Sequence, residues 1–408
     1  MNWICCQRGA REHYAVPRAL YTASKLECLM TEFYVPRWLA WLGRNVQGGM
    51  IARMISRCHH QLKNSRIKSW NCQALVRSLR DNGANRYEYY LRENGWIAGK
   101  WLSWLKKNVN PLGKVFFSYS GTALEIFRWA KENGGFTVLG VIDPGRVEQE
   151  MVREESRMWP GWELRQDEVP EEYNNVRDAE CELADIVVVN SEWSRKALIQ
   201  QGVPSGKITV VPLCYEEEVV TGGGEICKSG DVIDKQGREF SVLFLGQVIL
   251  RKGIQYLVEA ARQPELSQVR FNVVGPIGIS DEAIRSAPSN VKFHGPVNRL
   301  EATKWYRQSD LFVLSTISDG FAITQIEAMA NGLPVIATPN CGEVVRDGVD
   351  GLIVPIRDAQ ALAGAIWRFV EDRGFHERCR REALKRCREF SLQHLQNRLI
   401  ELEEHLRN

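Results

Sequence analysis

The residues with the clearest capacity for chemistry are two acids, Asp319 and Glu327, with seven residues between them. Asp319 follows an apolar run that ends in a polar turn, and a helix is predicted to begin at 322–324, which places Glu327 about one turn inside it. Backbone N–H groups at a helix start favour an anion such as a diphosphate, and here they belong to Phe321, Ala322 and Ile323. The pattern fits equally well an N-capping Asp319 and a Glu327 in a surface ion pair, so both interpretations stay open on the residues alone.

A second candidate anion site follows the apolar run that ends at Leu245. Gly246 and Gln247 begin a glycine-containing loop, and Arg251 and Lys252 end it before a predicted helix. An arginine can hold phosphate oxygens in a fork, whereas a lysine supplies a point charge. The spacing matches neither G-x-x-x-x-G-K-[ST] nor G-x-G-x-x-G. A solvated pair of cations is therefore the alternative to a phosphate clamp.

Both candidate sites belong to a chain in which short apolar runs alternate with segments of helical period, the pattern of parallel βαβ units. In the first half, strands are predicted at Trp3–Cys6, Leu26–Met30, Val115–Ser118, Phe136–Ile142, Ile186–Asn190 and Ile208–Val211. In the second half, they are predicted at Ser241–Leu245, Val269–Val274, Val291–Phe293, Leu311–Leu314 and Val335–Ala337. The predicted fold class is α/β, with two doubly wound, Rossmann-like domains facing each other across a ligand-binding cleft.

The periodicity divides the chain into four predicted parts. Residues 1–215 form a first domain and residues 240–390 a second. Residues 216–239 lose all periodicity and carry several glycines, as a linker or surface loop does. Residues 391–408 are predicted to form one helix that is a candidate to cross back to the first domain. Ser391 is its N-cap, and its apolar residues recur at three- and four-residue spacing: Leu395, Leu399, Leu402 and Leu406.

The composition is that of a globular protein, with 408 residues of which 44% are hydrophobic and 25% charged. These values exclude disordered, fibrous and polytopic membrane classes. No uncharged apolar stretch reaches about 18 residues, and Arg8 and Arg11 interrupt the region where a signal peptide has its apolar core, so we expect a cytoplasmic protein. The 11 cysteines are scattered, odd in number and without a C-x-x-C pair, so neither a disulfide framework nor a zinc site is expected.

The net charge of +3 conceals a strongly basic stretch. Between Arg37 and Lys107, fourteen Lys or Arg stand against three acids, with tryptophans interleaved at positions Trp38, Trp41, Trp70, Trp96, Trp101 and Trp104. One interpretation is a solvated basic face over core tryptophans. Another is a surface that contacts anionic lipid head groups, with cations for attraction and indoles for the interface. No recognition motif accompanies the charge, so we expect no nucleic-acid partner.

From Asp319 to Ala337 the chain resembles the retaining glycosyltransferases of family 4, or glycosyl transferases group 1, which have the GT-B fold. Their signature is E-G-F-G-x-x-x-x-E-A-M-A-x-G-x-P-V-I-A, and this segment follows it closely. Further blocks match in order at Ala184–Glu192, Lys207–Pro212, Arg251–Gly253, Phe293–Gly295, Cys341–Val345 and Asp347–Pro355. The resemblance covers the chain from about Asp178 to its C-terminal end.

The resemblance implies a role for each matching residue. Asp319, the first acid, contacts hydroxyls of the transferred sugar, and Glu327, the second, holds the ribose hydroxyls of the nucleotide. Lys252 neutralises the leaving diphosphate, next to the loop that begins at Gly246. The turn from His294 to Val297 contacts the base through its backbone. The amides that approach the sugar ring and phosphates are those of Phe321, Ala322 and Ile323.

Three departures from the family pattern affect these roles. Asp319 stands where the family has Glu, so the carboxylate reaches one methylene less far. Gln247 replaces the usual arginine beside the glycine, and we expect Arg251 to compensate for the missing cation. In the first domain, Asp143 stands where the family often has a histidine near the reacting carbon. A plain turn residue before a proline is the alternative for Asp143.

The implied reaction moves a sugar, with retention of anomeric configuration, from a nucleotide-diphosphate sugar to a glycan or lipid-linked acceptor in polysaccharide or glycolipid synthesis. The donor is expected to be a UDP- or GDP-sugar bound by the second domain, with the acceptor on the first. A donor phosphate oxygen is expected to help deprotonate the acceptor hydroxyl. No cofactor or metal is expected, because the chain has no D-x-D motif.

Two other functions remain open from the sequence. The alternative enzyme is a nucleotide-sugar epimerase of the same fold. The alternative from another class is a non-catalytic nucleotide-sugar-binding module, motivated by Asp319 and Gln247. For the location of the protein in the cell, peripheral contact with the inner face of an anionic membrane remains open beside a purely cytoplasmic location.

Overall fold

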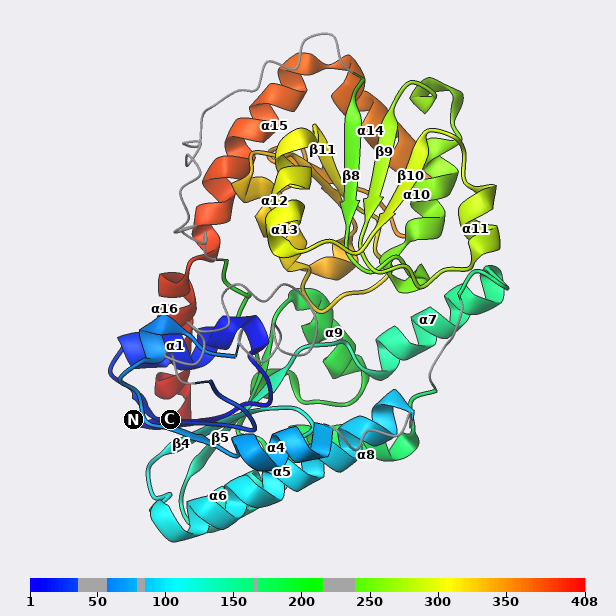
Figure 1. Ribbon diagram of the computed structural model, residues 1–408. Helices are drawn as coiled ribbons and strands as arrows, with labels where there is room; N and C mark the ends of the chain where they lie inside the picture. Colours follow the sequence, from blue (N-terminus) through cyan, green and yellow to red (C-terminus); the bar gives the residue numbers. More distant parts are fainter. Residues whose placement is uncertain (36–56, 79–84, 164–167, 216–238, 408) are drawn as a thin grey trace.

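The computed structural model describes residues 1–35, 57–78, 85–163, 168–215 and 239–407. Two parallel β-sheets, each flanked by helices, occupy the two halves of the chain and lie one above the other in Figure 1. The expected α/β class with two doubly wound sheets is confirmed.

In the described residues, the first half forms a seven-stranded sheet with the order β3-β2-β1-β4-β5-β6-β7 and every neighbouring pair parallel. The winding reverses between β1 and β4, the point at which such sheets bind ligands. The strands are β1 Trp3–Cys6, β2 Leu26–Thr31, β3 Ile67–Ser69, β4 Val115–Tyr119, β5 Phe136–Val141, β6 Ile186–Val189 and β7 Ile208–Val210.

The second half forms a sheet of six described strands, again all parallel, with the order β10-β9-β8-β11-β12-β13. Here the winding reverses between β8 and β11. The strands are β8 Ser241–Leu245, β9 Arg270–Val274, β10 Val291–Gly295, β11 Leu311–Leu314, β12 Val335–Ala337 and β13 Gly351–Ile353.

Helices cover both faces of each sheet (Figure 1). Those of the first half are α1 Ala15–Thr22, α4 Asn71–Ser78, α5 Arg86–Asn108, α6 Leu124–Glu132, α7 Arg146–Met158, α8 Glu171–Leu183 and α9 Glu192–Gln200. Those of the second half are α10 Ile254–Ala261, α11 Asp281–Ser286, α12 Arg299–Gln308, α13 Ile323–Ala330, α14 Ala359–Glu371, α15 Arg373–Arg386 and α16 Leu392–Arg407. Short 3₁₀ turns lie at η1 Arg11–Tyr14, η2 His60–Leu62, η3 Ser205–Lys207, η4 Leu250–Lys252, η5 Pro264–Leu266, η6 Pro339–Cys341 and η7 Cys387–Phe390.

The central strands are buried on both faces, which explains their continuous apolar runs. In β4 every residue is buried, and successive side chains enter opposite layers of the core. Phe116 belongs to the core cluster on one face of the sheet, with Trp101 of α5, whereas Phe117 belongs to the cluster on the other face, with Trp3 and Leu399.

The last helix, α16, packs beside α1 of the first half, although the chain reaches it from the second (Figure 1). Its four leucines join the core cluster that contains Trp3. Glu403 accepts hydrogen bonds of 2.8 Å from both the Trp3 indole and the N-terminal amine. The two ends of the chain are thereby held together.

All the predicted strands occur, with shifts at their ends, but two strands were missed. Ile67–Ser69 contains one apolar residue and Gly351–Ile353 starts at a glycine, so neither has a recognisable period. Pairing with β2 and with β12 makes them strands. The division into domains at 1–215 and 240–390 stays our proposal. The predicted linker lies, except for Glu239, outside the described residues, as do Trp38 and Trp41 of the basic stretch.

Candidate functional site

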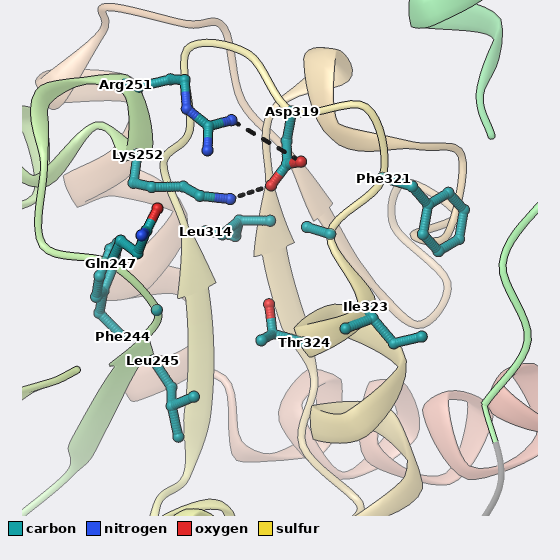
Figure 2. A pocket seen from close by; sticks show the side chains of 12 residues that line it. Phe244, Leu245, Gln247, Arg251, Lys252, Leu314, Asp319, Phe321, Ile323 and Thr324 are labelled. Atoms are coloured by element: carbon teal, nitrogen blue, oxygen red, sulfur yellow. Dashed lines mark hydrogen bonds and ion pairs between the residues drawn. The ribbon is translucent and has the colours of Figure 1, made fainter. Parts of the chain in front are cut away.

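A cavity of about 260 Å³ lies where β8 and β11 end, at the point where the second sheet reverses its winding. Figure 2 shows Arg251 and Lys252 on one side of it, both directed at Asp319. The lining residues are Phe244, Leu245, Gly246, Gln247, Arg251, Lys252, Leu314, Asp319, Phe321, Ala322, Ile323 and Thr324. The two candidate anion sites of the sequence are thus parts of one cavity.

The position of Lys252 is fixed by the turn η4 and the glycine that follows it. Gly253 has a left-handed backbone, with φ of 71°. A Cβ at this position would lie 1.8 Å from the carbonyl oxygen of Ser315, so no other residue fits without moving β11's exit loop. The glycine therefore lets η4 pack against that loop and places Lys252 beside Asp319.

Asp319 belongs to a loop that is hydrogen-bonded to η6. Its N–H donates to the carbonyl of Asn340 (2.8 Å), and the Asn340 amide donates to the carbonyl of Ile317 (3.0 Å). The carboxylate forms an ion pair with Lys252 and lies 4.0 Å from the Arg251 guanidinium. The residue before α13 is Ala322, which has no side-chain cap, so the interpretation of Asp319 as an N-cap is wrong.

The electrostatics of the cavity keep Asp319 ionised. Burial of the carboxyl acts to raise its pKa, but the charges of Lys252 and Arg251 outweigh that effect. Hydrogen bonds from Lys252 and from the Phe321 N–H act in the same direction, so the pKa lies below its ordinary value.

Arg251 is held from several sides. Its Nη1 donates to the carbonyl of Ser318 (3.0 Å) and approaches Glu148 Oε2 at 3.4 Å. Its own carbonyl accepts from the Ile317 N–H (2.9 Å) and the Thr316 hydroxyl (3.0 Å). Arg251 and Gln247 line the same cavity, and the compensation of Gln247 by Arg251 stays a prediction. Gln247 itself is exposed and lines the cavity together with Gly246.

The backbone N–H groups before α13 differ from the expectation. The Phe321 N–H bonds to Asp319, and the Ala322 N–H donates to the carbonyl of Cys341 (3.1 Å). Both groups are therefore engaged inside the protein rather than free for an anion. Among the described residues, the N–H groups of Ile323 and Thr324 have no such hydrogen bond, and both residues line the cavity.

Glu327, His294 and Val297 lie outside the lining of this cavity. Glu327 accepts a hydrogen bond of 2.9 Å from the buried hydroxyl of Tyr306. In the described residues it has no ion pair, so the alternative of a surface salt bridge does not hold. His294 bonds to Asn272 (3.0 Å) and its ring contacts Trp305, while Val297 packs against the core beside it.

Burial lowers the pKa of His294, and the positive charge of Lys292 adds to the effect. The imidazole is therefore biased toward its neutral form. The ring is exposed and lies against Trp305. Its contact with a nucleotide base stays a prediction from the resemblance.

Asp143 lies in the loop between β5 and α7 of the first half, outside the lining of the cavity. Of its side chain 42% is exposed, and it pairs with the buried Arg177 at 3.3 Å. A Cβ on Gly320 would lie 1.8 Å from the carbonyl oxygen of Ile142, so the glycine after Asp319 allows the two halves to touch at this point. Asp143 is also close enough to Arg251 to raise its pKa.

Four residues that join the two halves were not predicted as site residues: Ser191, Trp193, Ser318 and Glu148. Ser191 donates to the carbonyl of Gly320 (2.7 Å), and the Trp193 indole donates to Ser318 Oγ (3.0 Å). Ser318 Oγ in turn donates to Glu148 Oε2 (2.8 Å). A weak sequence signal exists for Ser191, which lies in a matching block at the end of β6. No local pattern distinguishes Glu148 from the other acids of α7.

The basic stretch has its described tryptophans on or near the core. Trp101 is fully buried, and Trp70, Trp96 and Trp104 are partly buried against the same cluster. Three cations lie over their rings: Lys68 on Trp70, Arg77 on Trp96 and Arg66 on Trp104. Across the part of the chain that the structure describes, no helix is long and apolar enough to span a membrane, and no group of His, Cys, Asp or Glu is arranged to hold a metal ion.

Residues 239–372 match the family model described as glycosyl transferases group 1. An uncharacterized 41.2 kDa protein of Klebsiella pneumoniae from its cps region is 26% identical over 185 residues, which is 44% of this chain and 50% of that protein. A D-inositol 3-phosphate glycosyltransferase of a Nocardioides species is 33% identical over 114 residues, 28% of this chain and 25% of that protein. The chain thus spans half or less of the length of these curated relatives.

Solved structures resemble the whole chain. Sucrose-phosphate synthase from Thermosynechococcus elongatus has a TM-score of 0.67 at 18% identity, over 100% of this chain and 99% of that one. HepE from Anabaena, solved with UDP and glucose, has a TM-score of 0.65 at 15% identity, over 99% of this chain and 100% of that one. At such identities the likeness shows the fold alone, and that fold is GT-B.

Proposed function

We propose that this chain, which has the GT-B fold and resembles the glycosyl transferases group 1 over residues 239–372, is a glycosyltransferase. The donor is a nucleotide-diphosphate sugar bound in the second half. The observation that carries the proposal is the cavity in which Arg251 and Lys252 converge on Asp319 beside the start of α13. Two cations and two unengaged helix-start amides suit a diphosphate.

The proposed roles follow from how each side chain or amide can stabilise the negative charge that develops on the donor diphosphate. Cleavage of the bond to the anomeric carbon leaves negative charge on the diphosphate, and cations fixed beforehand stabilise that charge. Lys252 and Arg251 supply them, with the amides of Ile323 and Thr324. When the donor binds, the Asp319 carboxylate leaves its ion pair with Lys252 and accepts hydrogen bonds from hydroxyls of the sugar. The Glu327 carboxylate accepts hydrogen bonds from the ribose hydroxyls.

The proposed transfer retains the anomeric configuration, with a donor phosphate oxygen accepting the proton of the acceptor hydroxyl. The acceptor is a glycan or a lipid-linked sugar on the first half, where the backbone of Ile142 and Asp143 lies against Gly320. A relative from a cps region fits a role in polysaccharide synthesis. UDP is the favoured nucleotide, because HepE, of the same fold, was solved with UDP and glucose.

A donor screen tests this proposal. Purified protein is heated with UDP-, GDP-, ADP- and TDP-sugars, and a bound donor raises the melting temperature by stabilising the fold by roughly 2 to 3 kcal/mol at about 100-fold over Kd. Release of free nucleoside diphosphate without an acceptor, or faster with one, identifies a transferase. Conversion to a second nucleotide sugar identifies the epimerase alternative, and binding without turnover identifies the non-catalytic module. No shift with any nucleotide sugar contradicts all three.

A further inference from the structure

Glu148 is a carboxylate of α7, in the first half, that points at the cations of the second half. Its Oε2 accepts a hydrogen bond from Ser318 Oγ (2.8 Å) and lies 3.4 Å from Arg251 Nη1. Only 15% of its side chain is exposed. It therefore contacts both Ser318, in the loop that carries Asp319, and one of the two cations, although the sequence pattern does not single it out.

The helix that carries Glu148 is anchored on the second half at both ends. Seven residues further on, on the same face of α7, the buried Glu155 accepts hydrogen bonds from Gln255 (2.7 Å) and Tyr256 (3.0 Å) and pairs with Arg357 (2.5 Å). Figure 1 shows α7 lying beneath the second sheet. This anchoring limits how far Glu148 can move away from Arg251.

The charges around the cavity already compensate one another. Arg251 and Lys252 face Glu148 and Asp319, while Asp143 is occupied by Arg177. A diphosphate that enters must compete with both carboxylates for the two cations. Asp319 has another partner in the proposed donor complex, the sugar hydroxyls, whereas Glu148 lies outside the cavity lining and keeps only the hydrogen bond from Ser318.

The two carboxylates differ in how they titrate. Burial raises the pKa of Glu148 to about 7; Arg251 and the hydrogen bond from Ser318 oppose this rise, and the negative charges of Asp143 and Asp319 add to it. The pKa of Asp319 lies below its ordinary value. Near neutral pH, Glu148 is the group that can lose its charge by taking up a proton.

We propose that Glu148 is a positioning residue of the donor site that acts through Arg251. As a carboxylate it holds the guanidinium against the Ser318–Asp319 turn, and as a neutral acid it leaves the guanidinium to the donor diphosphate. The inference rests on the proposed donor site. Its consequence is that donor binding is coupled to uptake of a proton by Glu148.

The sign of the pH dependence follows from this coupling. A diphosphate near Glu148 raises the pKa of its carboxyl in the complex, because like charges disfavour ionisation. The protonated form therefore binds the donor more tightly. Donor affinity is highest below about pH 7 and weakens as the pH rises above it, by at most tenfold per pH unit. The decrease ends once the pH exceeds the pKa that the Glu148 carboxyl has in the donor complex.

Calorimetric titration of UDP-glucose, or of the nucleotide sugar with the largest shift in the donor screen, tests the inference between about pH 6 and pH 8. The diphosphate of a nucleotide sugar is a diester and does not titrate in this range. We expect the wild-type Kd to rise severalfold with pH. In Glu148→Gln, whose amide oxygen can still accept from Ser318, we expect a Kd that is tight and independent of pH, because the neutral side chain leaves Arg251 to the diphosphate at every pH.

Two further variants separate positioning from folding. Glu148→Asp keeps a titrating carboxyl and should keep the pH dependence. Glu150→Gln, at an exposed position of the same helix, should behave as wild type. Melting temperatures report whether each variant is folded. A wild type that binds no nucleotide sugar contradicts the proposed function, and the inference with it. A wild type that binds but shows the same pH dependence in Glu148→Gln, or none in either, overturns the inference alone.

Discussion

The ion pair between Lys252 and Asp319 joins two turns that lie 67 positions apart in the chain. Each side chain is more than four-fifths buried and each reaches the same cavity. In the free protein each neutralises the other, so neither charge is left without a partner in a poorly solvated place. In the proposed donor complex, the diphosphate contacts Lys252 and the sugar contacts Asp319, so two separate contacts replace this ion pair.

Replacement of Lys252 by alanine tests the proposed role of the pair. We expect Lys252→Ala to reduce kcat by about two to three orders of magnitude, because one fixed positive charge at a developing anion is lost. Lys304→Ala, at an exposed position of α12, is the matched control and should leave turnover unchanged. Steady-state kinetics with the identified donor provide the measurement. A Lys252→Ala enzyme with wild-type kcat/KM contradicts the assignment of this residue.

Replacement of Glu327 by alanine tests the proposed ribose contact. We expect Glu327→Ala to weaken donor binding by roughly tenfold or more, since hydrogen bonds to a charged group contribute about 1.5 to 3 kcal/mol. The substitution also removes the partner of the Tyr306 hydroxyl. Tyr306→Phe loses that same internal hydrogen bond but keeps the carboxylate, and it should bind the donor as wild type does. Equal Kd values for the two variants would assign Glu327 to stability instead.

At the scale of elements, the site depends on loops that are fixed by contacts with other parts of the chain. The Asp319 loop is held by η6 on one side and by Ser191 and Trp193 of the first half on the other. Comparable fixation occurs in the first half at the end of β4, where Glu180 of α8 accepts hydrogen bonds from three backbone N–H groups and the Ser120 hydroxyl. These bonds hold the turn before α6 and supply the missing cap of that helix.

Replacement of Glu180 by alanine should destabilise the first half. The carboxyl is buried, so its removal leaves several buried N–H groups without an acceptor, and we expect a loss of about 3 kcal/mol or more in the free energy of unfolding. Glu182→Ala, exposed on the same helix, is the control and should change stability by less than about 0.5 kcal/mol. Urea denaturation measures both. A small effect of Glu180→Ala would mean that water replaces the carboxylate.

At the scale of the whole molecule, the basic surface of the first half forms around β3, α4 and α5. None of the residues of α4 is buried, and Leu75 and Val76 are exposed there. Arg66 and Arg77 lie over the rings of Trp104 and Trp96, both partly buried, and Arg77 also pairs with Glu93. Arg66, Lys106 and Lys107 are exposed there. We propose that this surface contacts anionic lipid head groups, which would place a lipid-linked acceptor close to the first half.

Vesicle co-sedimentation tests this membrane contact. Each cation near an anionic surface contributes on the order of 1 kcal/mol, so we expect binding to phosphatidylserine-containing vesicles at low salt, loss of binding at high salt, and no binding to neutral vesicles. A triple replacement of Arg66, Lys106 and Lys107 by glutamine should weaken binding about tenfold or more, whereas Lys304→Gln should not. The absence of binding to anionic vesicles at low salt would leave a soluble acceptor as the better proposal.

Much of the fold could be predicted from local patterns, because buried parallel strands and amphipathic helices impose their periods on the residues themselves. The strands β8 and β11, the start of α13 and the positions of Gly253 and Gly320 all have such local signals. The resemblance then pointed to Asp319 and Lys252, whose motifs are short and contiguous. By itself the sequence therefore determined the α/β class, the two sheets and the loops that carry the candidate site.

Only the tertiary structure decided which of these residues meet. The engagement of the Phe321 and Ala322 amides depends on Asp319 and on η6, and the partner of Glu327 is a tyrosine 21 positions away. Glu148 lies 103 positions from Arg251 and has no local pattern that marks it. The first two contacts form where loops of the second half pack on one another, and the third forms where α7 packs against η4. Such packing is set by the shape and burial of whole surfaces. The side chains of the first half that hold the Asp319 loop, those of Ser191, Trp193 and Glu148, could therefore be found only in the folded molecule.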